Sequence, residues 1–192
     1  MEALLISLAV VAAAEIGDKT QLLALLLAAK YRKPVPVVAG IFVATILNHG
    51  IAAGVGVAVA EWLGPERLRW IIGLSFLGMA AWTLVPDKMD DEPKMWEKAG
   101  PFIATLVTFF LVEIGDKTQV ATVALGARFG DMVSVTMGTT LGMLIADVPA
   151  VFVGGAMADR LPLKLVRTIA AALFAVLGIL ALTDAGAGLL AP

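Results

Sequence analysis

Six apolar segments, each long enough to cross a lipid bilayer, constrain this chain more than any other feature of its sequence. They lie near residues 3–29, 35–60, 68–85, 102–127, 132–157 and 163–183. Within a hydrocarbon core about 30 Å thick, a backbone must satisfy its own hydrogen bonds, so each segment is expected to be a helix. The chain is also only 16% charged, against about 25% for soluble domains. We therefore predict an all-α integral membrane protein with six transmembrane helices.

Composition excludes several classes of protein. With a net charge of −2 and no nucleic-acid-binding motif, the chain lacks the basic surface that nucleic acid requires. It has no cysteine, which rules out disulfides, zinc–thiolate sites and iron–sulfur clusters. A single histidine and no HExxH motif argue against an intramembrane metalloenzyme, which needs several fixed ligands. We expect no enzymatic activity and no prosthetic group.

The second half of the sequence repeats the first. The string EIGDKTQ occurs twice, beginning at Glu15 and at Glu113, 98 positions apart, and the same offset pairs Gly40 with Gly138. Because each unit holds an odd number of helices, the second copy must enter the membrane from the opposite side. The sequence thus predicts two inverted-topology three-helix repeats. They are residues 1–85 and 102–192, joined by a cytoplasmic linker, 86–101.

Basic residues in the loops predict the orientation, because cytoplasmic loops are richer in lysine and arginine than outer loops. If the amino terminus is outside, nine basic loop residues are cytoplasmic and three are not. The nine are Lys30, Arg32, Lys33, Lys88, Lys94, Lys98, Arg160, Lys164 and Arg167. We predict a multi-pass protein of the inner (cell) membrane with both termini on the outer side. The sequence leaves the oligomeric state open, a homodimer included.

Each EIGDKTQ string places charges near the middle of a predicted span, where one charge costs about 2.5 kcal/mol or more. Glu15 lies 12 residues after Ala3, which is about 18 Å along a helix. At about 100° per residue the charged side chains share one face, from which Thr20 falls away unless the helix unwinds at Gly17. Such unwinding would also free backbone carbonyls as additional oxygen ligands.

By the symmetry of the repeats, the two polar faces should meet near a pseudo-two-fold axis. Four carboxylates would then share one chamber: Glu15, Asp18, Glu113 and Asp116. Two motif lysines would offset two of these charges, and the remaining two match one divalent cation or two protons. The pattern therefore favours exchange of a metal ion for protons. The supporting residues of the two motifs are Lys19, Lys117, Thr20, Thr118, Gln21 and Gln119.

A second pair of polar positions lies within the predicted spans. Asn48 and His49 occur in TILNHGIAAG, and the offset of 98 places Asp147 opposite His49. Hard divalent cations take oxygen ligands, whereas manganese also accepts imidazole. We predict that these three residues join the four carboxylates as metal ligands, with Mn²⁺ favoured and Ca²⁺ as the alternative transported ion. A purely structural ion pair in each motif, and a packing role for His49, stay open.

Two copies of E-x-G-D-[KR]-[ST] in a six-helix chain of this length resemble the Gdt-type cation exchangers. That family includes bacterial manganese exporters and Golgi manganese/calcium–proton exchangers, and the resemblance covers essentially the whole chain. It implies export of Mn²⁺, or of Ca²⁺, coupled to protons. The family's motif positions are Glu15, Asp18, Lys19, Thr20, Glu113, Asp116, Lys117 and Thr118, and both copies match without departure. The resemblance assigns no role to His49 or Asp147.

Two other functions stay open on the sequence. A small organic-solute exporter of the amino-acid type would need an apolar pocket beside the charges. An intramembrane structural subunit would use its polar motifs only to hold helices together, so carboxamide substitutions would leave no transport phenotype. For the exchanger, the expected partners are a divalent cation, protons and the lipid bilayer, and not nucleic acid.

Overall fold

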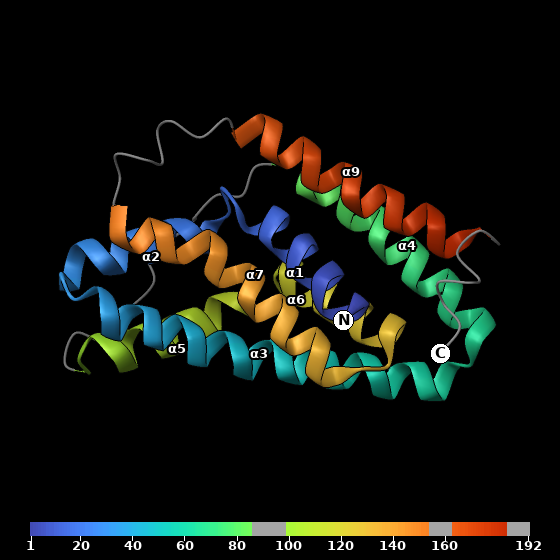
Figure 1. Cartoon of the computed structure of the whole chain (residues 1–192), viewed down its shortest axis with the longest axis horizontal. Coiled ribbons are helices and arrows are strands. Elements are labelled where there is room, and N and C mark those ends of the chain that lie inside the picture. The colour runs from blue at the N-terminus through green and yellow to red at the C-terminus, as the bar shows by residue number, and fades with distance from the viewer. Residues whose placement is uncertain (86–98, 154–162, 184–192) are drawn as a thin grey trace.

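A computed structural model describes residues 1–85, 99–153 and 163–183. In these ranges the chain forms eight helices and no strand, which confirms the all-helical prediction. The helices are α1 (Glu2–Glu15), α2 (Lys19–Tyr31), α3 (Pro34–Leu63), α4 (Pro65–Thr83), α5 (Pro101–Glu113), α6 (Lys117–Phe129), α7 (Met132–Val153) and α9 (Leu163–Leu182). Figure 1 shows them packed in one bundle, with α4 and α9 side by side along one flank.

Two of the six expected helices are each divided in two. The segment expected at 3–29 is α1 and α2, and that at 102–127 is α5 and α6, because the chain leaves the helix within each EIGDKTQ string. The other four expected segments correspond to α3, α4, α7 and α9. Residues 86–98 of the expected linker, and the last residues of the segment expected at 132–157, lie outside the described ranges.

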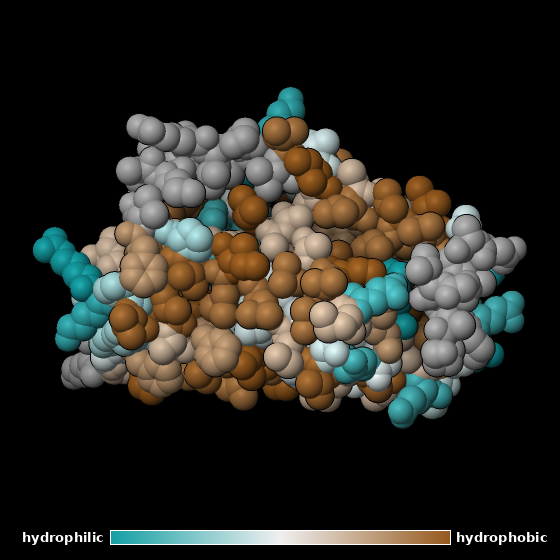
Figure 2. All heavy atoms as spheres, viewed as in Figure 1, coloured by the Kyte–Doolittle hydropathy of each residue, from teal (hydrophilic) through white to brown (hydrophobic). Residues whose placement is uncertain are grey.

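Many large apolar side chains are exposed on the outside of the bundle. By length and hydropathy, two helices in the described ranges could each cross a membrane alone: Pro34–Leu63, with 30 residues, and Met132–Phe152, with 21. The halves of the divided helices have 13 or 14 residues, so one half covers only part of a core about 30 Å thick. Figure 2 shows a broad apolar band over the middle of the molecule and hydrophilic side chains towards its two ends. A continuous exposed apolar surface of this kind is typical of contact with lipid or another protein.

Residues one repeat apart contact each other at two places. The Thr45 hydroxyl donates a hydrogen bond to the Met143 sulfur at 3.1 Å, and the Phe76 and Phe174 rings stack with centroids 6.2 Å apart. In both pairs the partners are separated by 98 positions. Self-pairing of equivalent residues is expected where a two-fold axis relates two repeats, so these contacts indicate how the halves of the chain are joined.

Close helix crossings depend on glycines at equivalent positions. A methyl group added to Gly40 of α3 would lie 2.7 Å from the Thr105 Cβ of α5. One added to Gly138 of α7 would collide with the Leu4 carbonyl of α1. Small residues allow helix backbones to approach closely in the absence of a hydrophobic driving force. The α3–α5 and α7–α1 crossings are thus the same contact made twice, and they bring the two divided helices together.

Candidate cation site

Both EIGDKTQ strings interrupt their helices in the same way. In the first, Ile16 and Asp18 are extended and Gly17 has φ 80°. In the second, the equivalent residues are likewise extended on either side of Gly115, at φ 78°. A positive φ favours glycine because any Cβ would be strained there. The helix therefore unwinds at Gly17. Thr20 could join the other polar side chains of the motif only if it did.

A motif glutamine secures each break. The Gly17 backbone N–H donates to Gln21 Oε1 at 2.9 Å, and the Gly115 N–H donates to Gln119 Oε1 at 2.7 Å. The same amides then reach the other repeat: Gln21 Nε2 donates to the Ala146 carbonyl at 2.9 Å, and Gln119 Nε2 donates to Asn48 Oδ1. Positions 48 and 146 are equivalent in the repeat. Each glutamine thus holds its break open and fixes it to a helix of the opposite repeat.

The aspartates at the starts of α2 and α6 receive local hydroxyl donors. Thr20 donates to Asp18 Oδ2 at 3.5 Å, and Thr118 donates to Asp116 Oδ2 at 3.4 Å. Both threonines are fully buried. The motif threonine therefore orients the aspartate two residues before it, which an unbroken helix would not allow.

Two reciprocal ion pairs join the breaks. Lys19 Nζ lies 3.0 Å from Asp116 Oδ1, and Lys117 Nζ lies 2.6 Å from Asp18 Oδ1. Lys19 and Lys117 are equivalent, as are the two aspartates, so one contact is the image of the other under the repeat. The lysines neutralise aspartates of the opposite repeat.

Four other polar side chains converge between the breaks without hydrogen bonds. Glu15, Glu113, His49 and Asp147 are each 0% exposed. Within the described ranges, neither carboxylate oxygen of the three acids and neither ring nitrogen of the histidine has a hydrogen-bond partner. His49 Nε2 and Glu113 Oε2 are 3.5 Å apart. Buried polar atoms are nearly always satisfied, so such a cluster indicates a site built for a ligand.

The acids of the two repeats are close enough to influence one another. Four other acids repel a negative charge on Glu15. In decreasing order of this electrostatic effect they are Asp18, Asp147, Glu113 and Asp116. Glu15 and Glu113 are also the last residues of α1 and α5, where the helix dipole is negative and favours a cation.

Two partners in the site are backbone groups that a reading of side chains could not identify. The Ala146 carbonyl accepts from Gln21, and the Phe110 carbonyl accepts from Asn48 Nδ2 at 3.4 Å. The only sequence signal for the first is the offset of 98 from Asn48 to Ala146. No side-chain pattern distinguishes Phe110 from its neighbours.

The donors do not form a finished metal cage. In the part of the chain that the structure describes, no group of three or more His, Cys, Asp or Glu side chains is close enough to hold a metal ion. The ion pairs give a physical reason, because Lys117 and Lys19 occupy oxygens of Asp18 and Asp116. In this arrangement the carboxylates of the site lie near one another, but Asp18 and Asp116 are paired with lysines.

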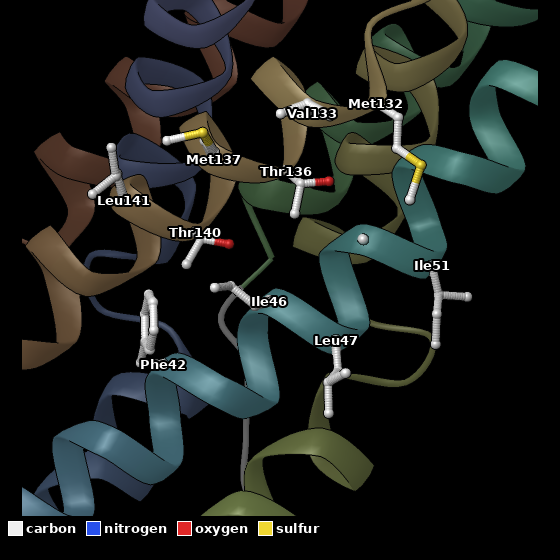
Figure 3. A pocket seen from close by; sticks show the side chains of 11 residues that line it. Phe42, Ile46, Leu47, Ile51, Met132, Val133, Thr136, Met137, Thr140 and Leu141 are labelled. Carbon is white, nitrogen blue, oxygen red and sulfur yellow. The ribbon is translucent and has the colours of Figure 1, made fainter.

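An apolar groove of about 560 Å³ lies between α3 and α7, outside this site. Figure 3 shows Phe42 and Ile46 of α3 opposite Thr136 and Thr140 of α7. Its lining contains no charged residue. The groove is therefore a depression in the apolar surface, separate from the charged site.

A helical bundle in which two broken helices cross at buried, unsatisfied carboxylates is the architecture of a secondary ion transporter. Comparison with known proteins gives the family. Its sequence profile, described as divalent cation/proton antiporter GDT1, matches residues 3–91 and 101–188. The chain belongs to the GDT1 family of divalent cation/proton antiporters.

Curated relatives agree with this membership. The chain is 55% identical over 175 residues to a Vibrio cholerae protein to which manganese export is attributed, covering 91% of this chain and 87% of the relative. GDT1-like protein 3 of Oryza sativa subsp. indica is 28% identical over 200 residues, covering 90% of this chain and 71% of that protein. GDT1-like protein 3 of Arabidopsis thaliana is 26% identical, with 90% and 68% covered. No solved structure matches the chain.

Proposed function

We propose that the chain exports Mn²⁺ across the inner membrane in exchange for protons, with Ca²⁺ as a second substrate. The observation that carries the proposal is the cluster of fully buried, hydrogen-bond-deficient side chains between the breaks: Glu15, Glu113, His49 and Asp147. The name given to the Vibrio cholerae relative supports manganese as the principal ion. The bilayer arrangement that we propose is six spans in two inverted repeats with both termini outside, which places the start of α2 on the cytoplasmic side of its break.

Charge balance supports exchange of one kind of cation for another. The two motif aspartates are paired with lysines, and we take Asp147, the third acid of the cluster, to stay protonated, so Glu15 and Glu113 contribute one negative charge from each repeat. Two such charges are neutralised by one divalent cation or by two protons. A protonated carboxylate is no longer a metal ligand, so metal and protons compete for the same oxygens. The competition couples their movements in opposite directions.

The donor types support manganese ahead of calcium. Carboxylate and amide oxygens suit both ions, whereas an imidazole suits Mn²⁺ better. His49 lies in the site, 3.5 Å from Glu113, and Asn48 precedes it. Unwound carbonyls at the breaks would add oxygen ligands of the kind that broken transporter helices supply.

The proposal is tested by transport in proteoliposomes that contain the purified chain. Mn²⁺ uptake driven by an imposed pH gradient, together with the opposite movement of protons, is expected for the wild type. Glu15→Gln and Glu113→Gln should each reduce uptake at least tenfold, because each removes a charge from the shared site. Glu61→Gln is the matched control, since Glu61 is an exposed acid near the end of α3. An Mn²⁺ uptake rate that does not depend on the imposed pH gradient would refute proton exchange.

Selectivity is tested separately with His49→Ala. Loss of the imidazole should weaken Mn²⁺ uptake more than Ca²⁺ uptake. Equal losses for the two ions would show that His49 is not a metal ligand and only packs in the site. Carboxamide variants that all transport normally would instead favour a structural role for the motifs.

A further inference from the structure

Within the described ranges, helices α4 and α9 make their main contacts with one pair of the broken-helix halves, α1 and α6. They lie against each other, α9 packs against α1, and α4 packs against α6. In Figure 1 the α4–α9 pair runs alongside α1, whereas α2 extends beyond the start of α9. One apolar cluster joins these four helices through residues such as Ala14, Leu125, Phe76 and Phe174. A second cluster joins α2 and α5 to α3 and α7, and among described residues it includes none from α4 or α9.

The two ion pairs show the same asymmetry. Lys117, at the start of α6, has a side chain that is 2% exposed, whereas the Lys19 side chain, at the start of α2, is 24% exposed. The helix that carries Lys117 is the one against which α4 packs. The charged site is therefore less exposed at the start of α6, where α4 packs, than at the start of α2.

A hydrogen bond ties the α4–α9 pair to the first break. Arg167 Nη2 of α9 donates to the Gly17 carbonyl at 3.5 Å, across 150 positions of sequence. Gly17 lies between α1 and α2, so its carbonyl belongs to neither helix. A guanidinium is well suited to this contact because it stays charged and carries several N–H donors.

The repeat contains a counterpart for both partners of this bond. The offset of 98 relates Arg167 to Arg69 of α4 and Gly17 to Gly115 of the second break. The stacked pair Phe76 and Phe174 shows that the same offset holds where α4 meets α9. In the present arrangement Arg69 lies over the Trp70 ring, with its guanidinium carbon 6.0 Å from the ring centroid. The same latch can therefore be formed on either side of the site.

We propose that Arg167 and Arg69 are alternating latches of the transport cycle. Arg167 holds the α4–α9 pair against the first break in the arrangement seen here, and Arg69 holds it against the Gly115 carbonyl in the opposite one. In that second state α4 packs against α5 and α9 against α2, which are the repeat-exchanged counterparts of the present contacts. The inference rests on the proposed exchange function, because a transporter needs both states.

The expected effect follows from the charge on the donor. A hydrogen bond from a charged group is strong enough that losing it changes the ratio of two states about tenfold or more. Arg167→Gln should therefore move the population away from the present arrangement by about that factor. Arg69→Gln should move it in the opposite direction, because it removes the latch of the other state.

The experiment measures the position of α9 directly. The chain has no cysteine, so spin labels attach only where cysteines are introduced. Val35 at the start of α3 and Val176 on α9 are 72% and 54% exposed. Pulsed electron–electron double resonance between labels at these positions is recorded in lipid for the otherwise wild-type chain, Arg167→Gln, Arg69→Gln and Lys164→Gln. Lys164 is an exposed cation on α9 and serves as the charge-matched control.

The two arginine variants should shift the distance distribution in opposite directions, while Lys164→Gln matches the wild type. Arg167→Lys keeps a charged donor, so its distance distribution should stay close to that of the wild type. Shifts in the same direction, or no shift in either arginine variant, would overturn the proposal. Mn²⁺ uptake by the same labelled proteins is measured in parallel. Opposite shifts in a protein that moves no Mn²⁺ would support the latches and reject the proposed substrate.

Discussion

The two reciprocal ion pairs allow a direct test of how burial affects the stability that an ion pair contributes, because they are chemically identical and differ in environment. Lys117–Asp18 has side chains that are 2% and 0% exposed, whereas in Lys19–Asp116 the lysine is 24% exposed. We consider Lys117→Gln and Lys19→Gln, which remove one cation from each pair and nearly conserve side-chain length. Each leaves an aspartate of the opposite repeat without its lysine.

The structure gives different magnitudes for the two changes. Removing one partner of a fully buried pair costs about 3–5 kcal/mol, because the remaining charge stays buried and uncompensated. An exposed pair contributes only about 0.2–1 kcal/mol. The aspartate left behind by Lys19→Gln, Asp116, is itself only 1% exposed, but the Lys19 side chain is 24% exposed, so water can take the place of the ammonium beside it. The loss of Lys19 should therefore cost less, about 1–2 kcal/mol. For a chain of this length, the midpoint temperature of thermal unfolding should then fall by about 6–20 °C for Lys117→Gln and about 2–8 °C for Lys19→Gln.

Thermal unfolding in detergent, followed by the fluorescence of the native tryptophans, measures the difference. The double variant Asp18→Asn with Lys117→Gln should recover most of the loss, because it leaves no buried unpaired charge. Equal destabilisation by the two lysine substitutions would refute the reasoning, since it would mean that the pairs are equally buried. A double variant as unstable as Lys117→Gln alone would also contradict it.

Two further outcomes follow from backbone geometry and capping. Gly115→Ala should destabilise the fold by about 1–2 kcal/mol and lower Mn²⁺ uptake per folded molecule. An added Cβ at Gly115 (φ 78°) or at Gly64 (φ 73°) meets nothing within 4 Å, so the loss at each comes from backbone strain. Gly64→Ala, at ψ 163°, should also destabilise the fold but leave uptake per folded molecule normal. Normal uptake by Gly115→Ala would show that the break geometry is not needed. Asp131 accepts the Ser134 N–H at 3.0 Å, and hydrogen bonds from Ser134 hold the pKa of Asp131 below its ordinary value of 3.8. Asp131→Ala should therefore cost about 1 kcal/mol near neutral pH, and the cost should persist through mildly acidic pH and fade only as the pH drops below the ordinary pKa of 3.8. Urea titrations at several pH values measure this loss, with Lys33→Ala at the equivalent, uncapped start of α3 as the control. A loss for Asp131→Ala that does not change with pH would contradict the cap.

Much of the site could be predicted because the motif is repeated and is polar where its surroundings are apolar. Glu15 and Glu113 at an offset of 98 indicated two equivalent buried acids, and Gly17 indicated where the helix could unwind. Periodicity could not establish the break itself, because an unbroken helix was equally consistent with the apolar segment. The expected six helices accordingly became eight in the described ranges.

The pairing of the lysines could not be predicted. Glu15 and Lys19 are four positions apart, a spacing typical of an ion pair within one helix. The break separates them into α1 and α2, and the contacts of Lys19 and Lys117 cross to the opposite repeat. These partners depend on how the helices cross, and the crossings depend on packing at positions such as Gly40 and Gly138, far from the motif.

The sequence by itself determined the helical class, the duplication and the identity of the buried polar residues, because hydropathy and repeated motifs are properties of the chain alone. Only the tertiary structure decided which aspartate each lysine binds and on which side of the site α4 and α9 pack. The physical reason lies in the duplication. Two nearly equivalent repeats allow the helix pair to pack against either of two similar surfaces, so local sequence cannot choose between them. That choice is made by contacts between residues far apart in the chain, such as Arg167 and Gly17.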